Sequence, residues 1–178
     1  MAGTSRSGQQ HFVEATPTIE ASSAYSAGDS IGAAVISLAG ATAETGGLTA
    51  AEVREAAGWG TGNETHGGMI QSVILTDLGK QSAEIDVVFF DADPSQTTFT
   101  DNAALDVDDA DLLNIVGVAA VTTWKDFSDN SVGQTLNLAI PFVLEDGGNT
   151  LYAALVSRGT PTYASTADLT LRVGVLAG

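Results

Sequence analysis

The sequence has no cysteine, and this absence excludes disulfide bonds, thiolate zinc sites and cysteine nucleophiles. It also has no run of about 18 apolar residues, the length that a membrane-spanning helix needs. The first residues, MAGTSRSGQQH, contain no apolar segment of the kind that signal peptides carry. We therefore expect a protein that is made in the cytoplasm, lacks a signal peptide and does not insert into a membrane.

Basic residues are scarce, since six Lys and Arg stand against 22 Asp and Glu, and the net charge is −16. The six occur singly along the chain, at Arg6, Arg54, Lys80, Lys125, Arg158 and Arg172. Nucleic acid binding and binding to anionic membranes both need clustered basic residues, so we expect neither partner. An acidic surface of this kind keeps a protein soluble in salt.

Groups that commonly carry catalysis are few. The chain has two histidines, and His66 with Glu64 would supply only two ligands to a metal, which is too few for a site. There is no G-x-S-x-G motif, and the glycine-rich stretch 58–68 lacks the lysine of a phosphate-binding loop. We expect no catalytic, cofactor-binding or metal-binding residues, although paired carboxylates of the glycosidase type are not specified by sequence and stay open.

Aromatic residues offer a second possibility, because Trp59, Trp124, Tyr152 and Tyr163 could form a platform for a carbohydrate or a protein partner. Such side chains more often lie in the core or anchor a subunit interface, and we favour that interpretation.

The pattern of apolar residues predicts a chain of β-strands separated by turns rich in Gly, Pro and Asp. We expect an all-β fold, an antiparallel β-sandwich of jelly-roll-like type with about eight strands. Residues 69–76 and 84–90 flank the turn DLGK and predict a hairpin, and Pro141 is expected to end a strand. The eight predicted strands span residues 12–19, 31–38, 69–76, 84–90, 115–124, 136–140, 151–157 and 169–175.

The chain is expected to form an N-terminal arm, residues 1–11, followed by a single domain, residues 12–178. A long loop, residues 39–67, interrupts the domain. Within it, Thr49 and Glu52 have the spacing of a capping box and predict a short helix over 49–57. Long connections often carry function, so we interpret the arm and this loop as interaction elements. The candidate interface residues are Ser5, Arg6, Gln9, Gln10, His11, Trp59 and His66.

The segment LDVDDADLL places four aspartates in residues 105–113: Asp106, Asp108, Asp109 and Asp111. An EF-hand loop beginning at Asp106 would place Ala110 at its fifth position, where an oxygen ligand is needed, so the calcium register fails. The pattern instead predicts a short helical turn near 108–113, with Asp106 or Asp108 as its N-cap. Whether these acids bind a cation or face a basic patch on a partner stays open.

Several stretches carry a resemblance to a known family. They are TPTIEASSAYSAGDSIG, GGMIQSVILTDLGKQSAEIDVVFFDADPSQTTFTDNAA, DNAALDVDDADLLNIVGV and LNLAIPFVLEDGGNTLYAALVSRGTPTYASTADLTLRVGVL. Together they resemble a family of virion structural proteins of tailed phages, frequent in marine phages. The excursion 41–67 is longer than the link that the family usually has there.

The resemblance implies a non-enzymatic protein on the capsid surface of a virion, made in the host cytoplasm. The expected role is that of a capsid decoration (cement) protein, a homotrimer that binds the major capsid protein and stabilises the assembled shell. An alternative is a neck, tail or head-fibre protein of the same virion with a host-binding role. A third alternative is a carboxylate glycosidase or a calcium-dependent glycan-binding module.

Overall fold

The computed structural model describes residues 10–39, 67–144 and 150–177, and its described residues form nine strands in two antiparallel sheets. Among these residues the only helical element is η1, a single 3-10 turn (Leu112–Asn114). The predicted all-β sandwich is therefore confirmed. The helix predicted over 49–57 lies outside the described residues.

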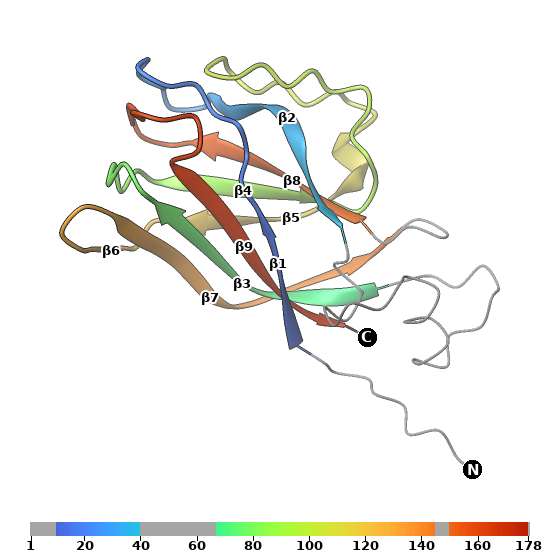
Figure 1. Ribbon diagram of the computed structural model, residues 1–178. Helices are drawn as coiled ribbons and strands as arrows, with labels where there is room; N and C mark the ends of the chain where they lie inside the picture. Colours follow the sequence, from blue (N-terminus) through green and yellow to red (C-terminus); the bar gives the residue numbers. More distant parts are fainter. Residues whose placement is uncertain (1–9, 40–66, 145–149, 178) are drawn as a thin grey trace, which may run out of the picture.

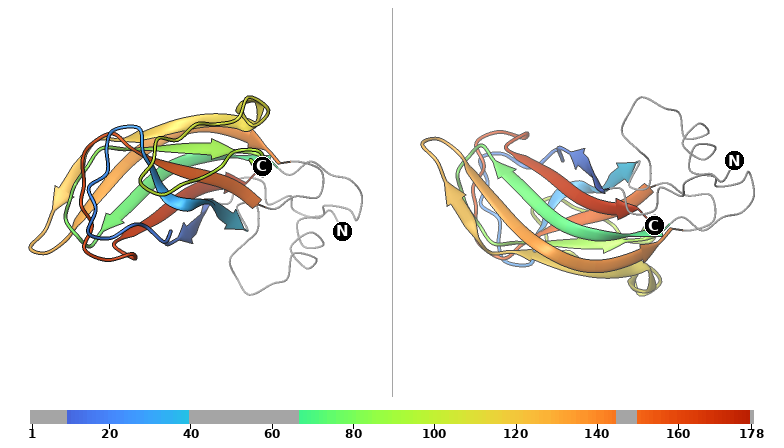
Figure 2. Two further views of the ribbon diagram at one scale, coloured as in Figure 1. Left: turned by 90° about the horizontal axis from the view of Figure 1, so that it is seen from above. Right: turned by 90° about the horizontal axis from the view of Figure 1, so that it is seen from below.

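The two sheets are stacked face to face (Figure 1, Figure 2). The first has the strand order β1-β9-β3-β7-β6, with bounds β1 (Gln10–Ala15), β9 (Leu169–Ala177), β3 (Gly67–Asp77), β7 (Ser131–Val143) and β6 (Trp124–Asp126). The second has the order β2-β8-β4-β5, with bounds β2 (Ser30–Ala39), β8 (Thr150–Ser157), β4 (Ile85–Phe90) and β5 (Ile115–Val121).

The strand orders show how the chain passes between the sheets. Only β4–β5 and β6–β7 are consecutive strands that pair with each other, so every other connection between described strands crosses to the opposite sheet. Without the short β6, the orders β1-β9-β3-β7 and β2-β8-β4-β5 are those of an eight-stranded jelly roll. The predicted jelly-roll-like arrangement matches this topology.

The core lies between the inner faces of the two sheets. In β9 the alternating residues Leu169, Leu171, Val173 and Val175 are all fully buried, as their spacing predicts. Burying one such aliphatic side chain stabilises the fold by about 1.5–3 kcal/mol. The alternation along this strand therefore fixes which of its faces meets the core.

A second apolar cluster covers the outer face of the four-stranded sheet. It consists of Val88 and Phe90 of β4 with Ala154 and Val156 of β8. Side chains of the long connection 91–114 pack against it: Phe99, Leu105 and Val107. The central strands β8 and β4 are thus covered on both faces, which explains why IDVVFF in β4 has so little polar alternation.

The predicted hairpin of residues 69–76 and 84–90 is wrong. β3 pairs with β7 and β9, whereas β4 pairs with β5 and β8 in the other sheet. The turn after β3 is held by Asp77, whose Oδ2 accepts hydrogen bonds from the backbone N–H groups of Gln81 and Ser82. The turn predicted at DLGK is present, but a local sequence pattern does not determine which strand pairs with β3.

Two predicted strand limits also need correction. The run 115–124 divides into β5 and β6, which lie in different sheets. Strand β7 does not stop before Pro141, which pairs with Met69 inside the ladder. Proline is tolerated there because β6 pairs only with residues 131–133, so among the described strands β7 has no neighbour on that side at Pro141.

Candidate functional site

The predicted interface residues are described only in part. Ser5, Arg6, Gln9, Trp59 and His66 lie outside the described residues. Gln10 is exposed at the start of β1 opposite Leu176, and the backbone of His11 pairs with Val175. The two described candidates therefore belong to β1, the outermost strand of its sheet.

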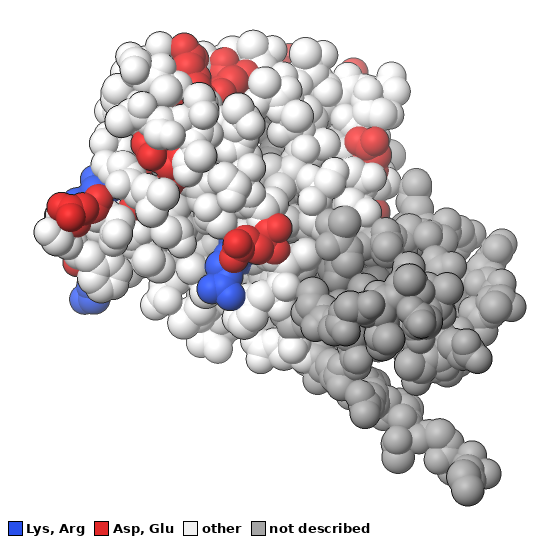
Figure 3. Space-filling model, in the orientation of Figure 1, with Lys and Arg blue, Asp and Glu red and all other residues white. Residues whose placement is uncertain are grey.

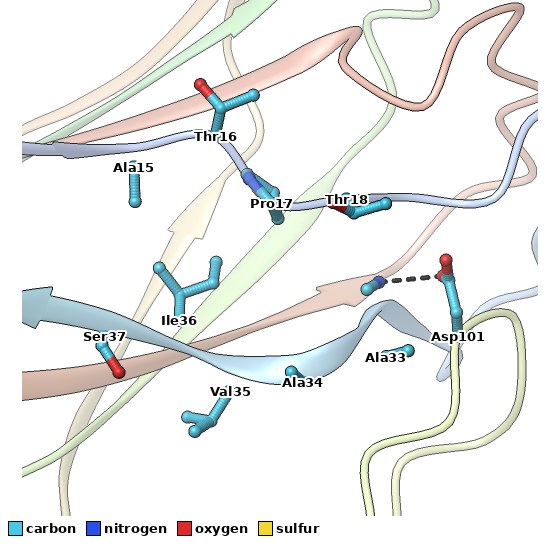
Figure 4. Close-up of a pocket in the computed structure, with 11 residues that line it drawn as sticks. Ala15, Thr16, Pro17, Thr18, Ala33, Ala34, Val35, Ile36, Ser37 and Asp101 are labelled. Atoms are coloured by element: carbon cyan, nitrogen blue, oxygen red, sulfur yellow. Dashed lines mark hydrogen bonds between the residues drawn. The ribbon is translucent and has the colours of Figure 1, made fainter.

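A pocket of about 380 Å3 lies between the end of β1 and the middle of β2 (Figure 4). Each of these strands is the outermost of its sheet, so the pocket marks an edge of the sandwich. Its walls are residues 15–18 and 32–37, mostly alanine, threonine and valine, together with Asp101. The close-up shows Ile36 pointing toward the β1 segment and Asp101 at the opposite end.

The pocket depends on an irregularity in β2. The register of β2 against β8 shifts between Ile31 and Ile36, so the intervening residues leave the ladder. Gly32 has φ +104°, a conformation that L side chains rarely adopt. Its backbone N–H donates to Asp101 Oδ1 at 2.8 Å, which replaces a ladder hydrogen bond.

Asp101 links segments that are distant in the sequence. Its Oδ1 also accepts a hydrogen bond from the Tyr25 hydroxyl at 2.6 Å, and that hydroxyl accepts one from the N–H of Glu20. Burial, followed by the hydrogen bond to Asp101, raises the pKa of Tyr25 well above its ordinary value. The hydroxyl thus keeps its proton, and Asp101 holds the pocket in shape rather than serving as a free catalytic carboxylate.

The aspartates of LDVDDADLL do not act as a unit. Asp111 is 3% exposed, and its Oδ2 accepts hydrogen bonds from the backbone N–H groups of Gln96 and Thr97 and from the Thr97 hydroxyl. Asp106 and Asp109 are exposed. Among the described residues no group of three or more His, Asp or Glu could hold a metal ion.

The helical turn predicted near 108–113 begins later in the structure than the sequence predicts. Asp108 begins a turn, since its Oδ1 accepts from Ala110 and its carbonyl oxygen accepts from the N–H groups of Asp111 and Leu112. The helix itself is η1, and its N-cap position is Asp111, which makes no side-chain capping bond. The sequence reasoning missed that Asp111 turns inward to hold the segment 96–97.

Charge is dispersed over the described surface. Acidic residues are scattered across the face shown in Figure 3, and few basic side chains are visible there. Arg158 Nε lies 2.7 Å from Asp86 Oδ2. Arg172 Nε lies 3.1 Å from Glu14 without hydrogen-bond geometry, and its guanidinium stands over the Phe12 ring. Such exposed pairs contribute at most about 1 kcal/mol each.

The chain matches no family model, no curated protein and no solved structure. In the described part of the chain, no helix is long and apolar enough to cross a membrane.

Proposed function

We propose that the protein is a non-enzymatic structural protein of a phage particle, a decoration protein that binds the major capsid protein on the assembled head shell. The observation that supports this most is the strand order of a jelly roll, an architecture common in viral capsid proteins. A fold hosts many functions, so the sequence resemblance to tailed-phage virion proteins is the second support.

The proposed action is binding rather than chemistry. A ligand that binds only the assembled lattice stabilises it by mass action, by about 2.7 kcal/mol when present at 100 times its dissociation constant. We propose a homotrimer, because a closed symmetric oligomer fits local three-fold positions of a shell.

We propose that the contact with the shell uses the edge formed by β1 and β2. Among the described strands, β1 has a partner only on its β9 side and β2 only on its β8 side. An unpaired strand edge can accept an extended segment of a neighbouring protein through backbone hydrogen bonds. The candidate residues Gln10 and His11 lie in β1, and the candidates Ser5, Arg6 and Gln9 precede them in the sequence.

Cryo-electron microscopy of whole particles tests the proposal. We expect density of the sandwich at repeated positions on the outer face of the head shell, with copies numbering in the hundreds by quantitative mass spectrometry. Density confined to the neck, the tail or a head fibre, with about a dozen copies or fewer, would contradict it and support the alternative location.

A further inference from the structure

Two buried carboxylates meet at one end of the sandwich. Asp77 closes β3 and is fully buried, and Asp168 directly precedes β9 and is 7% exposed. A methyl group placed on Gly79 would stand 3.0 Å from Asp168 Oδ2 and 3.5 Å from Asp77 Oδ1. Both carboxylates therefore border the same small space beside Gly79.

One oxygen of each carboxylate is used by the backbone. Asp77 Oδ2 accepts hydrogen bonds from Gln81 and Ser82 at 2.7 and 2.9 Å. Asp168 Oδ2 accepts hydrogen bonds from the N–H groups of Ala164 and Ser165 at 3.0 and 2.9 Å. These bonds shape the two loops and hold both carboxylates in place.

Other polar atoms at this end have no partner in the described structure. They are Asp77 Oδ1, the Ser131 hydroxyl and the Tyr163 hydroxyl, and all three residues are 0% exposed. Ser131 is the cross-strand neighbour of Asp77 in the β3–β7 ladder. Burial and then the charges of Asp77 and Asp168 raise the pKa of Tyr163, so its hydroxyl stays protonated within the field of both carboxylates.

No basic side chain of the described residues neutralises this pair. The described ion pairs use Arg158 and Arg172, and Lys80 Nζ in the adjoining turn donates to the carbonyl oxygen of Ser128. Buried polar groups are normally hydrogen-bonded, and buried charges are normally paired or bound to a metal. The two carboxylates thus bring uncompensated negative charge to the space beside Gly79.

We propose that this cluster binds a divalent cation of the calcium class through Asp77 Oδ1 and the Asp168 carboxylate, with the hydroxyl oxygens of Ser131 and Tyr163 beside it. All the available ligand atoms are oxygen, and hard cations such as Ca2+ prefer oxygen ligands more strongly than softer metals do. Ca2+ takes six to eight oxygen ligands, so water completes the shell and the affinity is weak, with a dissociation constant on the order of 0.1–1 mM. Binding would join the turn after β3 to the loop before β9. The site is independent of the proposed role in a capsid.

Thermal unfolding of the chelator-treated full-length protein, with CaCl2 added at pH 7, tests the proposal. We expect the melting temperature to rise by about 3 °C or more in roughly 10 mM CaCl2, since the cation binds only the folded state. Asp77→Asn keeps an oxygen acceptor for Gln81 and Ser82 but removes the charge, and should abolish the rise. The matched control Asp106→Asn removes an exposed aspartate and should keep it.

Gly79→Ala supplies a second variant, because its added methyl group would narrow the space without removing charge. Calorimetric titration of wild type with CaCl2 should detect binding, and Gly79→Ala should weaken it at least fivefold. Absence of heat and of a melting shift in wild type would overturn the proposal, and so would an equal shift in Asp77→Asn, which would indicate general charge screening. If the protein became more stable at acid pH but did not respond to Ca2+, a proton rather than a cation would neutralise Asp77, and the proposal would be wrong.

Discussion

At the scale of single residues, several of the described carboxylates accept hydrogen bonds from the backbone and so shape loops. Asp101 holds the bulge of β2, Asp111 holds the segment 96–97, and Asp77 and Asp168 shape two turns. A carboxylate that accepts several N–H bonds organises a loop where no ladder is possible. An acidic composition therefore contributes to this fold as well as to its solubility.

Substitutions of Asp111 and of Asp109 test whether a buried, hydrogen-bonded carboxylate stabilises the fold more than an exposed one. Replacing Asp111 by alanine leaves the N–H groups of Gln96 and Thr97 without their acceptor inside the protein. We expect the free energy of unfolding, measured by urea denaturation, to fall by about 1–3 kcal/mol. Asp109→Ala removes an exposed carboxylate from the same segment and should change it by less than about 0.5 kcal/mol. Equal effects of the two substitutions would show that Asp111 has no special role.

The pH dependence of stability should report on Asp77. Its burial, followed by the charge of Asp168, raises the pKa of Asp77, although N–H bonds from Ser82 and Gln81 oppose the change. Because the folded state then holds the proton more tightly than the unfolded state, the contribution of Asp77 is greatest below its ordinary pKa of 3.8 and is lost as pH rises through the higher folded value.

The measurement is the difference in free energy of unfolding between wild type and Asp77→Asn, both in chelator, from pH 3 to pH 7. We expect wild type to lose stability relative to the variant as pH rises. Asparagine at position 77 keeps an oxygen acceptor for the N–H groups of Gln81 and Ser82 but does not titrate, so the comparison isolates the Asp77 carboxyl and its coupling to Asp168 and Tyr163. A difference that does not change with pH would contradict the raised pKa.

At the scale of elements, glycine is required at two strand positions, at one for close packing and at the other for backbone conformation. Gly133 of β7 packs against the segment that joins β5 to β6. A Cβ at this position would stand 2.7 Å from Val121 and 2.8 Å from Trp124. In β2, Gly32 supplies the positive φ of the bulge. Gly133 thus permits close packing inside a regular ladder, whereas Gly32 permits the bulge of β2.

Gly32→Ala should destabilise the protein by about 1–3 kcal/mol, because alanine is strained at φ +104°. Gly159→Ala is the control, since its Cβ would meet Ala83 at 3.4 Å, an ordinary contact, without a positive φ. Chemical denaturation of the two variants compares them. If Gly159→Ala lost as much stability as Gly32→Ala, the conformational argument would fail.

At the scale of the whole molecule, a net charge of −16 is spread over a surface with few basic groups. Such a field repels phosphate-rich partners and attracts a basic surface over about one Debye length. If the shell presents basic residues to this protein, the charge will speed and strengthen docking.

Binding of the purified protein to shells that lack it should therefore weaken at least tenfold between about 50 and 500 mM NaCl, because salt screens exposed charges. Sedimentation of shells with bound protein measures this, and analytical ultracentrifugation of the free protein measures whether it is a trimer. DNA mobility should be unaffected under the same conditions. Salt-independent binding would show that the contact does not depend on the acidic surface.

The all-β class of the fold follows from local sequence patterns alone. Alternation with period two is a local property, and the buried faces of β9 and β4 follow it at residues such as Leu171 and Val87. Composition was likewise sufficient to predict an acidic protein with turns at Asp and Gly.

Which strands are neighbours, and which groups the acidic side chains bind, depends on tertiary contacts. β3 joins β7 and β9 rather than β4, and β7 continues through Pro141 because its edge is open there. The bond from Tyr25 to Asp101 and the meeting of Asp77 with Asp168 join residues far apart in the chain. Such contacts depend on how the two sheets stack, and an alternation of apolar and polar residues along one strand does not determine the stacking.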